Sequence, residues 1–215
     1  MDNSKPKLVL LDIDGTLFDH LNYKKILRDK LSEELGARGE KFDVIFRDTY
    51  RQSVSEKGTF TPEHFLNLLL NKLGKVVDID RLKEVVDQKE IIESFLFPDV
   101  SHFLEQASIL VKLGILSKGF PDFQRLKLQT FSHLLEKDKI YIFTDKKSQA
   151  PKVALENTNF KVYFIDNDPD TLDTYKKQDS SWTTILIERY GPLDYNDVSD
   201  FKIGSLLEAI EIIEK

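Results

Sequence analysis

The sequence predicts an α/β fold, in which a doubly wound parallel sheet is interrupted by an inserted all-helical cap. Short apolar segments alternate with helical patterns from residue 97 to the end, as in a parallel sheet whose strands are joined by helices. One more apolar segment stands alone near the start, at residues 8–13. The residues between these two regions show helical periodicity only. The length of 215 residues suits one core domain that carries a smaller insertion.

The isolated segment LVLLDI at residues 8–13 predicts the first strand. Its nearly unbroken apolar character is typical of a strand that is buried on both faces. The strand is expected to end at the turn formed by Asp14, Gly15 and Thr16.

Residues 20–96 predict the helical cap. Four helical patterns follow one another there, and the clearest has Thr61 as N-cap, Pro62 at its first position and Gly74 after its last turn. The stretch is far longer than a usual connection between neighbouring elements, so it must form a structure of its own. We therefore predict a core domain of residues 1–19 plus 97–215 and a cap domain of residues 20–96.

The remaining chain predicts the rest of the core. Strands are expected at residues 109–116, 139–143, 161–165 and 182–188, with a helix at 121–137 and further helical patterns between the later strands. The sequence closes with a short strand pattern at 201–203 and a helix at 205–215.

Composition excludes several classes of function. The net charge of -6 offers no general attraction for nucleic acid or anionic lipid. There are no cysteines, so disulfides, thiolate nucleophiles and zinc–thiolate sites are absent. No segment approaches the roughly 18 apolar residues of a membrane span, and the N-terminal segment shows no targeting pattern. We expect a cytoplasmic protein, and the sequence leaves its oligomeric state open.

Polar residues follow each predicted core strand, where ligands bind in parallel α/β sheets. Asp12 and Asp14 follow the first strand and are two residues apart, so their carboxylates are expected to face one side. Ser117, the pair Lys146–Lys147 and the run Asp166–Asp168 follow later strands. Crowded carboxylates favour a hard cation such as Mg²⁺, which also binds phosphate oxygens. The cluster therefore predicts Mg²⁺ and a small anionic substrate.

These segments resemble the haloacid dehalogenase-like superfamily, in particular its phosphatases with a helical cap after the first strand. The resemblance spans nearly the whole chain and rests on four motifs in order: LDIDGTLFD at 11–19, ILSKG at 115–119, DKKSQAP at 145–151 and YFIDNDPDTL at 163–172. The first motif is the most specific of the four. The resemblance implies a Rossmann-like core and hydrolysis through a covalent aspartyl intermediate.

The resemblance also implies catalytic roles. Asp12 would be the nucleophile, Asp14 the general acid and base, and Ser117 a donor to a phosphoryl oxygen. For the lysine motif we favour Lys147 over Lys146, because Lys147 followed by Ser148 and a later proline fits the family pattern better. The family's dehalogenases lack the second carboxylate, so the presence of Asp14 favours phosphoryl chemistry.

Four residues are the predicted metal ligands: Asp12, Asp14, Asp166 and Asn167. Asn167 stands where the family usually has an acidic ligand, and whether it or Asp166 binds the metal stays open. Asp168 could be an additional ligand or a cap for the helix that begins near Pro169.

The predicted function is a Mg²⁺-dependent phosphatase that acts on a small phosphorylated metabolite through an aspartyl-phosphate. Two alternatives stay open. A phosphomutase would use the same Asp12 chemistry, and a catalytically degenerate phosphate-binding or scaffold protein is suggested by Asn167 and by Lys118, which stands where the family often has Asn.

Overall fold

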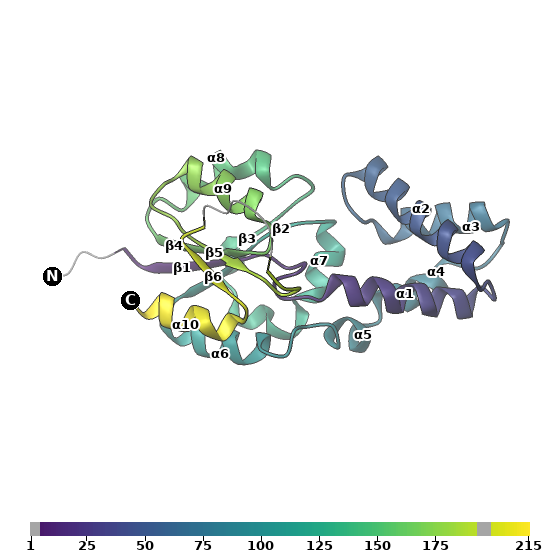
Figure 1. Ribbon diagram of the computed structural model, residues 1–215, viewed down its shortest axis with the longest axis horizontal. Coiled ribbons are helices and arrows are strands. Elements are labelled where there is room, and N and C mark those ends of the chain that lie inside the picture. The colour runs from purple at the N-terminus through teal and green to yellow at the C-terminus, as the bar shows by residue number, and fades with distance from the viewer. Residues whose placement is uncertain (1–4, 193–198) are drawn as a thin grey trace.

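The computed structural model describes residues 5–192 and 199–215 and places a six-stranded sheet beside a separate group of helices (Figure 1). The strands are β1 Lys7–Leu11, β2 Lys112–Lys118, β3 Ile140–Phe143, β4 Lys161–Asp166, β5 Thr183–Ile187 and β6 Phe201–Ile203. The α-helices of the described residues are α1 His20–Glu34, α2 Glu40–Lys57, α3 Pro62–Leu73, α4 Ile79–Asp87, α5 Lys89–Glu93, α6 Val100–Leu110, α7 Pro121–Lys127, α8 Ala150–Glu156, α9 Pro169–Gln178 and α10 Leu206–Glu214. The predicted α/β class is confirmed.

The sheet is parallel throughout, and its strand order is β3-β2-β1-β4-β5-β6. β1 lies between β2 and β4, and the chain builds outward from it in both directions, which is the doubly wound arrangement. The carboxyl ends of β1, β2, β3 and β4 therefore meet at one edge of the sheet.

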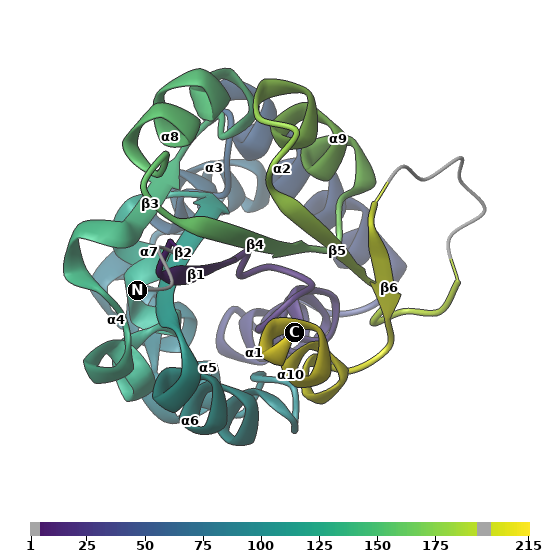
Figure 2. The same ribbon diagram turned by 90° about the vertical axis from the view of Figure 1, so that its left-hand side faces the viewer.

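Both faces of the sheet are covered. Along β1, Val9 and Leu11 pack into the core on one face, whereas Leu8 and Leu10 pack into the core on the other. Helices α6 and α10 cover the first face, and α8 and α9 cover the second (Figure 2). The unbroken apolar character of the β1 sequence follows from this double burial.

Helix α5 leads back to α7 of the core, whereas helices α1 to α4 form the cap beyond the carboxyl edge of the sheet (Figure 1). Their apolar stripes face one another, and Phe65 of α3 is fully buried between them. The predicted limits of α3 are confirmed, with Thr61 as N-cap, Pro62 at the first position and the left-handed Gly74 after the last turn.

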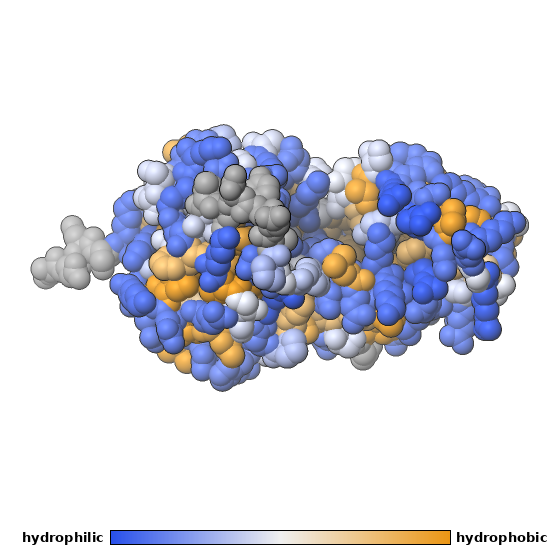
Figure 3. Space-filling model, in the orientation of Figure 1, coloured by the Kyte–Doolittle hydropathy of each residue, from blue (hydrophilic) through white to orange (hydrophobic). Residues whose placement is uncertain are grey.

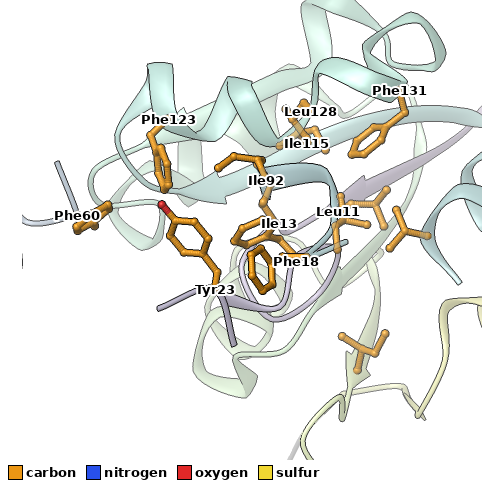
Figure 4. Close-up of a cluster of buried hydrophobic side chains, with 14 of the residues drawn as sticks. Leu11, Ile13, Phe18, Tyr23, Phe60, Ile92, Ile115, Phe123, Leu128 and Phe131 are labelled. Atoms are coloured by element: carbon orange, nitrogen blue, oxygen red, sulfur yellow. The ribbon is translucent and has the colours of Figure 1, made fainter. Parts of the chain in front are cut away.

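Two adjacent chain segments join the cap to the core. The backbone N–H of Asp19 donates to the carbonyl of Phe95 at 2.8 Å, and that of Phe97 donates to Leu17 at 3.0 Å. Beside this junction, the rings of Tyr23 and Phe60 from the cap meet Phe123 of α7 at centroid distances of 5.8 and 5.5 Å (Figure 4). The cap and the core therefore share one continuous apolar cluster.

Two predicted element boundaries are wrong. The strand expected at residues 109–116 begins at Lys112, because Ile109 and Leu110 form the last turn of α6 and expose their apolar side chains. The helix expected at residues 121–137 ends at Lys127 and is followed by a 3₁₀ segment, Gln129–Leu134. In that segment the Ser132 hydroxyl donates to the Gln129 carbonyl and so competes with α-helical hydrogen bonding.

On the face shown in Figure 3, the cap is mainly hydrophilic, and apolar side chains gather on the α6–α10 side of the core. Phe201 and Leu207 are among the exposed apolar residues of this side. Within residues 5–192 and 199–215, no helix has both the length and the apolar character needed to cross a membrane.

Candidate active site

Asp12 lies directly after β1, at the centre of the carboxyl edge of the sheet. Its backbone N–H donates to Ile165 of β4 at 3.0 Å, so the strand geometry persists to this residue and its side chain is held in place. The chain then turns sharply at Gly15, whose φ is +89°. Residues other than glycine rarely adopt this backbone conformation. The Asp12 side chain is almost fully buried, at 4% exposure for the residue.

Lys146 joins Asp12 to Asp166. Its ammonium lies 2.6 Å from an oxygen of each carboxylate, and all three side chains are buried. Burial raises the pKa of both Asp12 and Asp166, although the lysine opposes it. Burial alone would lower the pKa of Lys146, but the two carboxylates outweigh it and raise that pKa. The ammonium is therefore a fixed positive charge beside Asp12.

Lys147, which the sequence favoured over Lys146 for the lysine motif, does not face Asp12. Its side chain is 40% exposed and its ammonium lies 3.1 Å from Asp168. The Tyr175 hydroxyl donates to the Lys146 carbonyl at 2.8 Å and fixes the backbone at the start of the 3₁₀ turn Lys147–Gln149. Successive residues of such a turn point in different directions, so only Lys146 faces the site.

Asp14 is held by two side chains of α7. The Lys127 ammonium lies 2.6 Å from one carboxylate oxygen, and Gln124 Nε2 donates to the other at 2.7 Å. Burial acts to raise the pKa of Asp14, but the Lys127 charge and these hydrogen bonds outweigh it and hold that pKa below its usual value. Lys127 is itself buried and lies 4.5 Å from the ring centroid of Phe18. Neither Lys127 nor Gln124 is among the site residues predicted from the sequence.

Ser117 ends the buried part of β2. Its hydroxyl is fully buried and makes a small contribution to lowering the pKa of Asp12. Among the described residues it has no hydrogen-bond partner of full geometry. Two residues later, a Cβ on Gly119 would lie 2.3 Å from Gln124 Nε2. A glycine at this position therefore allows Gln124 to reach Asp14.

Asp166, the last residue of β4, and the two residues after it have three different roles. Asp166 is fully buried and accepts from the backbone N–H of Asp168 at 2.9 Å with the oxygen that Lys146 does not use. The Asn167 amide packs against Gly15, where a Cβ would lie 2.4 Å from Asn167 Nδ2. Asp168 caps α9 by accepting from the Asp170 N–H at 3.1 Å. Of the two roles considered for Asp168, the structure shows the helix cap.

The predicted metal ligands do not converge as a set. In the part of the chain that the structure describes, no group of three or more acidic, histidine or cysteine side chains is arranged to hold a metal ion. The carboxylate of Asp14 is engaged by Lys127, and both oxygens of Asp166 have partners. Asp12 and Asn167 both line one cleft. A carboxylate and an amide oxygen are ligand types that Mg²⁺ accepts together with water.

No family model and no curated protein matches the sequence. Among solved structures, a haloacid dehalogenase-like hydrolase of Burkholderia xenovorans LB400 has a TM-score of 0.78 at 16% identity, with 97% of this chain and 96% of that chain covered. The protein has the fold of the haloacid dehalogenase-like hydrolases. The magnesium-bound HAD-hydrolase YfnB of Bacillus subtilis shares this fold with a TM-score of 0.67 at 15% identity, covering 99% of this chain and 100% of that chain.

A dehalogenase shares the haloacid dehalogenase-like fold too. The L-2-haloacid dehalogenase of Xanthobacter autotrophicus, solved with chloropropionic acid covalently bound, has a TM-score of 0.62 at 17% identity and coverage of 97% and 98%. At these identities the likeness is one of fold. One fold supports different reactions, and the side chains at the site decide which reaction occurs.

Proposed function

We propose that the protein is a phosphoric monoester hydrolase of the haloacid dehalogenase-like superfamily, acting on a small phosphorylated substrate through Asp12. The observation that carries the proposal is Asp14, a second carboxylate that lines the same cleft as Asp12 and is held there by Lys127 and Gln124. By the sequence resemblance, the dehalogenases of this superfamily lack that carboxylate. Phosphoryl transfer needs it, because a proton must reach the leaving oxygen.

The reaction proceeds in two steps. An oxygen of Asp12 forms a bond to phosphorus as the ester P–O bond breaks, and Asp14 gives its proton to the leaving oxygen. A water molecule then loses a proton to Asp14 and attacks phosphorus, so that the bond to Asp12 breaks and inorganic phosphate leaves. In the free protein Lys127 holds the pKa of Asp14 low. The negative charge of a bound phosphate raises that pKa, so Asp14 takes up a proton from solvent as the substrate binds, donates it in the first step and regains one from water in the second.

The neighbouring groups stabilise the negative charge of the transferring phosphoryl group. Lys146 presents a fixed ammonium beside Asp12, and the Ser117 hydroxyl is a buried donor whose hydrogen bonding is unsatisfied. Mg²⁺ held by Asp12 and Asn167 would neutralise further charge on the phosphoryl oxygens. The magnesium found in the similar YfnB structure supports this cofactor.

The test is phosphate release from a panel of phosphorylated sugars, nucleotides, acyl phosphates and an aryl phosphate, with and without Mg²⁺. We expect Mg²⁺-dependent release that Asp12→Asn abolishes and that Asp14→Asn lowers by about a hundredfold or more. The variant Asp122→Asn is the matched control, because the Asp122 side chain is 81% exposed and its one ion pair among the described residues is with Arg125 on its own helix.

Other outcomes would point to the other activities. Release of chloride from 2-chloropropionate without phosphate release would assign the site to dehalogenation. Isomerisation of a sugar phosphate that requires added sugar bisphosphate would indicate a phosphomutase. Phosphate binding without turnover of any substrate would indicate a binding protein.

The cytoplasmic location expected from the sequence stays a prediction, and fractionation of source cells tests it.

A further inference from the structure

The cap contributes a lysine to the cleft that contains Asp12. The cleft has a volume of about 480 Å³ and lies between the carboxyl edge of the sheet and the cap. Asp12, Asp14 and Asp166 line its core side, and Lys24 of α1 and Tyr50 of α2 line its cap side. A substrate bound at Asp12 therefore reaches into a space that Lys24 borders.

The aromatic cluster of the cap fixes the position of the Lys24 ammonium. This group lies 3.7 Å from the ring centroid of Tyr50. The Tyr50 ring in turn stacks on Phe60 at a centroid distance of 5.0 Å and an interplanar angle of 16°, and it contacts Phe65 edge-on at 6.0 Å. Because three rings pack together, the surface beneath the ammonium is rigid.

Lys24 has no anionic partner in the described part of the chain. Burial, and to a smaller extent the nearby Arg51 charge, lower the pKa of Lys24. A ring face compensates a desolvated ammonium only in part, since its attraction is weaker than that of a full negative charge. An anion that enters the cleft would complete the environment of this lysine.

The carboxylates of the cleft already have other lysines. Asp12 and Asp166 share Lys146 at 2.6 Å each. Asp14 has Lys127 at 2.6 Å, and Asp168 has Lys147 at 3.1 Å. The positive charge of Lys24 is therefore not needed to balance the acidic residues on the core side.

We propose that Lys24, supported by Tyr50, forms a subsite for a second anionic group of the substrate, so that the substrate is a small phosphomonoester that also carries a carboxylate or a second phosphate. The inference rests on the proposed phosphatase activity and adds a substrate class to it. The phosphate that is cleaved binds at Asp12, and the other anionic group binds on the cap.

The test compares alkyl phosphates of two to four carbons that end in a methyl group, a carboxylate or a second phosphate. We expect wild type to prefer an anionic end over methyl by about tenfold or more in kcat/KM at one chain length, as a charge-assisted contact requires. Lys24→Met should reduce this ratio to about one, and Lys24→Arg should restore most of it. Lys25→Met is the matched control, since Lys25 is the next residue and is exposed; it should keep the wild-type ratio.

The outcomes separate the two proposals. Phosphate release with the same end-group ratio in wild type and Lys24→Met would overturn the subsite and leave the phosphatase intact. The absence of release from every compound would overturn the phosphatase. Calorimetry with the corresponding phosphonates, which cannot be hydrolysed, then still decides the subsite. Equal affinity of wild type for 3-phosphonopropionate and propylphosphonate, and likewise for their two- and four-carbon homologues, would refute it.

Discussion

Arg189 fixes the loop that carries Asp14, and its removal is expected to destabilise the protein measurably. Its Nη2 and Nε donate to the Thr16 carbonyl at 2.9 and 3.1 Å, and its Nη1 lies 2.8 Å from Asp99. The two charged side chains are only 6% and 13% exposed. Asp99 also accepts from the Ser205 hydroxyl and the Leu206 N–H. The guanidinium thus ties the loop that carries Asp14 to the start of two helices.

The expected cost of Arg189→Met follows from this geometry. Removing one partner of a buried ion pair typically costs about 3–5 kcal/mol. Asp99 keeps its hydrogen bonds to Ser205 and Leu206, so we expect the lower end, about 3 kcal/mol. For a chain of this length that corresponds to a fall in melting temperature of about 6–12 °C.

The assay is denaturant unfolding followed by fluorescence of Trp182, the single tryptophan, which is 1% exposed. Arg81→Met is the control, because the Arg81–Glu34 pair has a similar distance of 2.7 Å but is exposed, with an expected loss of less than about 1 kcal/mol. If Arg189→Met destabilised no more than Arg81→Met, the assigned role of Arg189 would be wrong.

The same pair predicts a pH dependence of stability. Burial acts to raise the pKa of Asp99, but hydrogen bonds from Arg189, Ser205 and Leu206 outweigh it and hold that pKa below its usual value. A lowered native pKa contributes stability above the pKa of the unfolded chain, about 3.9, and this contribution is lost as the pH falls through the native value. The difference in stability between wild type and Asp99→Asn should therefore shrink below about pH 4 in acid titrations.

Three further predictions concern the site itself. Lys146→Met should abolish phosphate release and lower the free energy of unfolding by about 3 kcal/mol or more. Lys147→Met, at an exposed residue, should keep phosphate release within about twofold of wild type. The reverse pattern would overturn the choice of Lys146 as the lysine of the site. Gly15→Ala should lower phosphate release at least about tenfold, because the backbone there has a positive φ and the new Cβ would collide with Asn167. Gly36→Ala is the control for backbone strain alone, because Gly36 also has a positive φ but its Cβ would meet no atom within 4 Å. Asn167→Asp should lower the Mg²⁺ midpoint of phosphate release, and an unchanged midpoint would remove Asn167 from the metal site.

The sequence was sufficient to predict which strand ends meet. Continuous apolar runs identified the buried strands, and the parallel arrangement then brought Asp12, Ser117 and Asp166 to one edge. The sequence could not decide between Lys146 and Lys147, because two lysines next to each other in a turn have the same chemistry and differ only in where their side chains point. The fit of Lys147 to a proline-spaced pattern carried no information about that direction.

Lys127 was missed for a different reason. A lysine in a short helix is normally solvated, and nothing in its own chemistry predicts burial. A signal was nevertheless present, since Lys127 follows Phe123 by four residues and so lies on the apolar stripe of α7. A charged residue on such a stripe needs a partner of opposite charge, and in the structure this partner is Asp14 of the first motif.

The central place of β1 in the sheet has a consequence for how the chain folds. Leu8 pairs with Lys112 and Lys7 with Lys161, so β1 is synthesised long before either of its neighbours. The helices of the cap make local contacts and can form early, whereas β1 stays unpaired, with exposed apolar side chains on both faces, until its neighbouring strands are made. We expect slow refolding limited by assembly of the sheet around this strand, and chains halted before β4 should aggregate on the ribosome or soon after release.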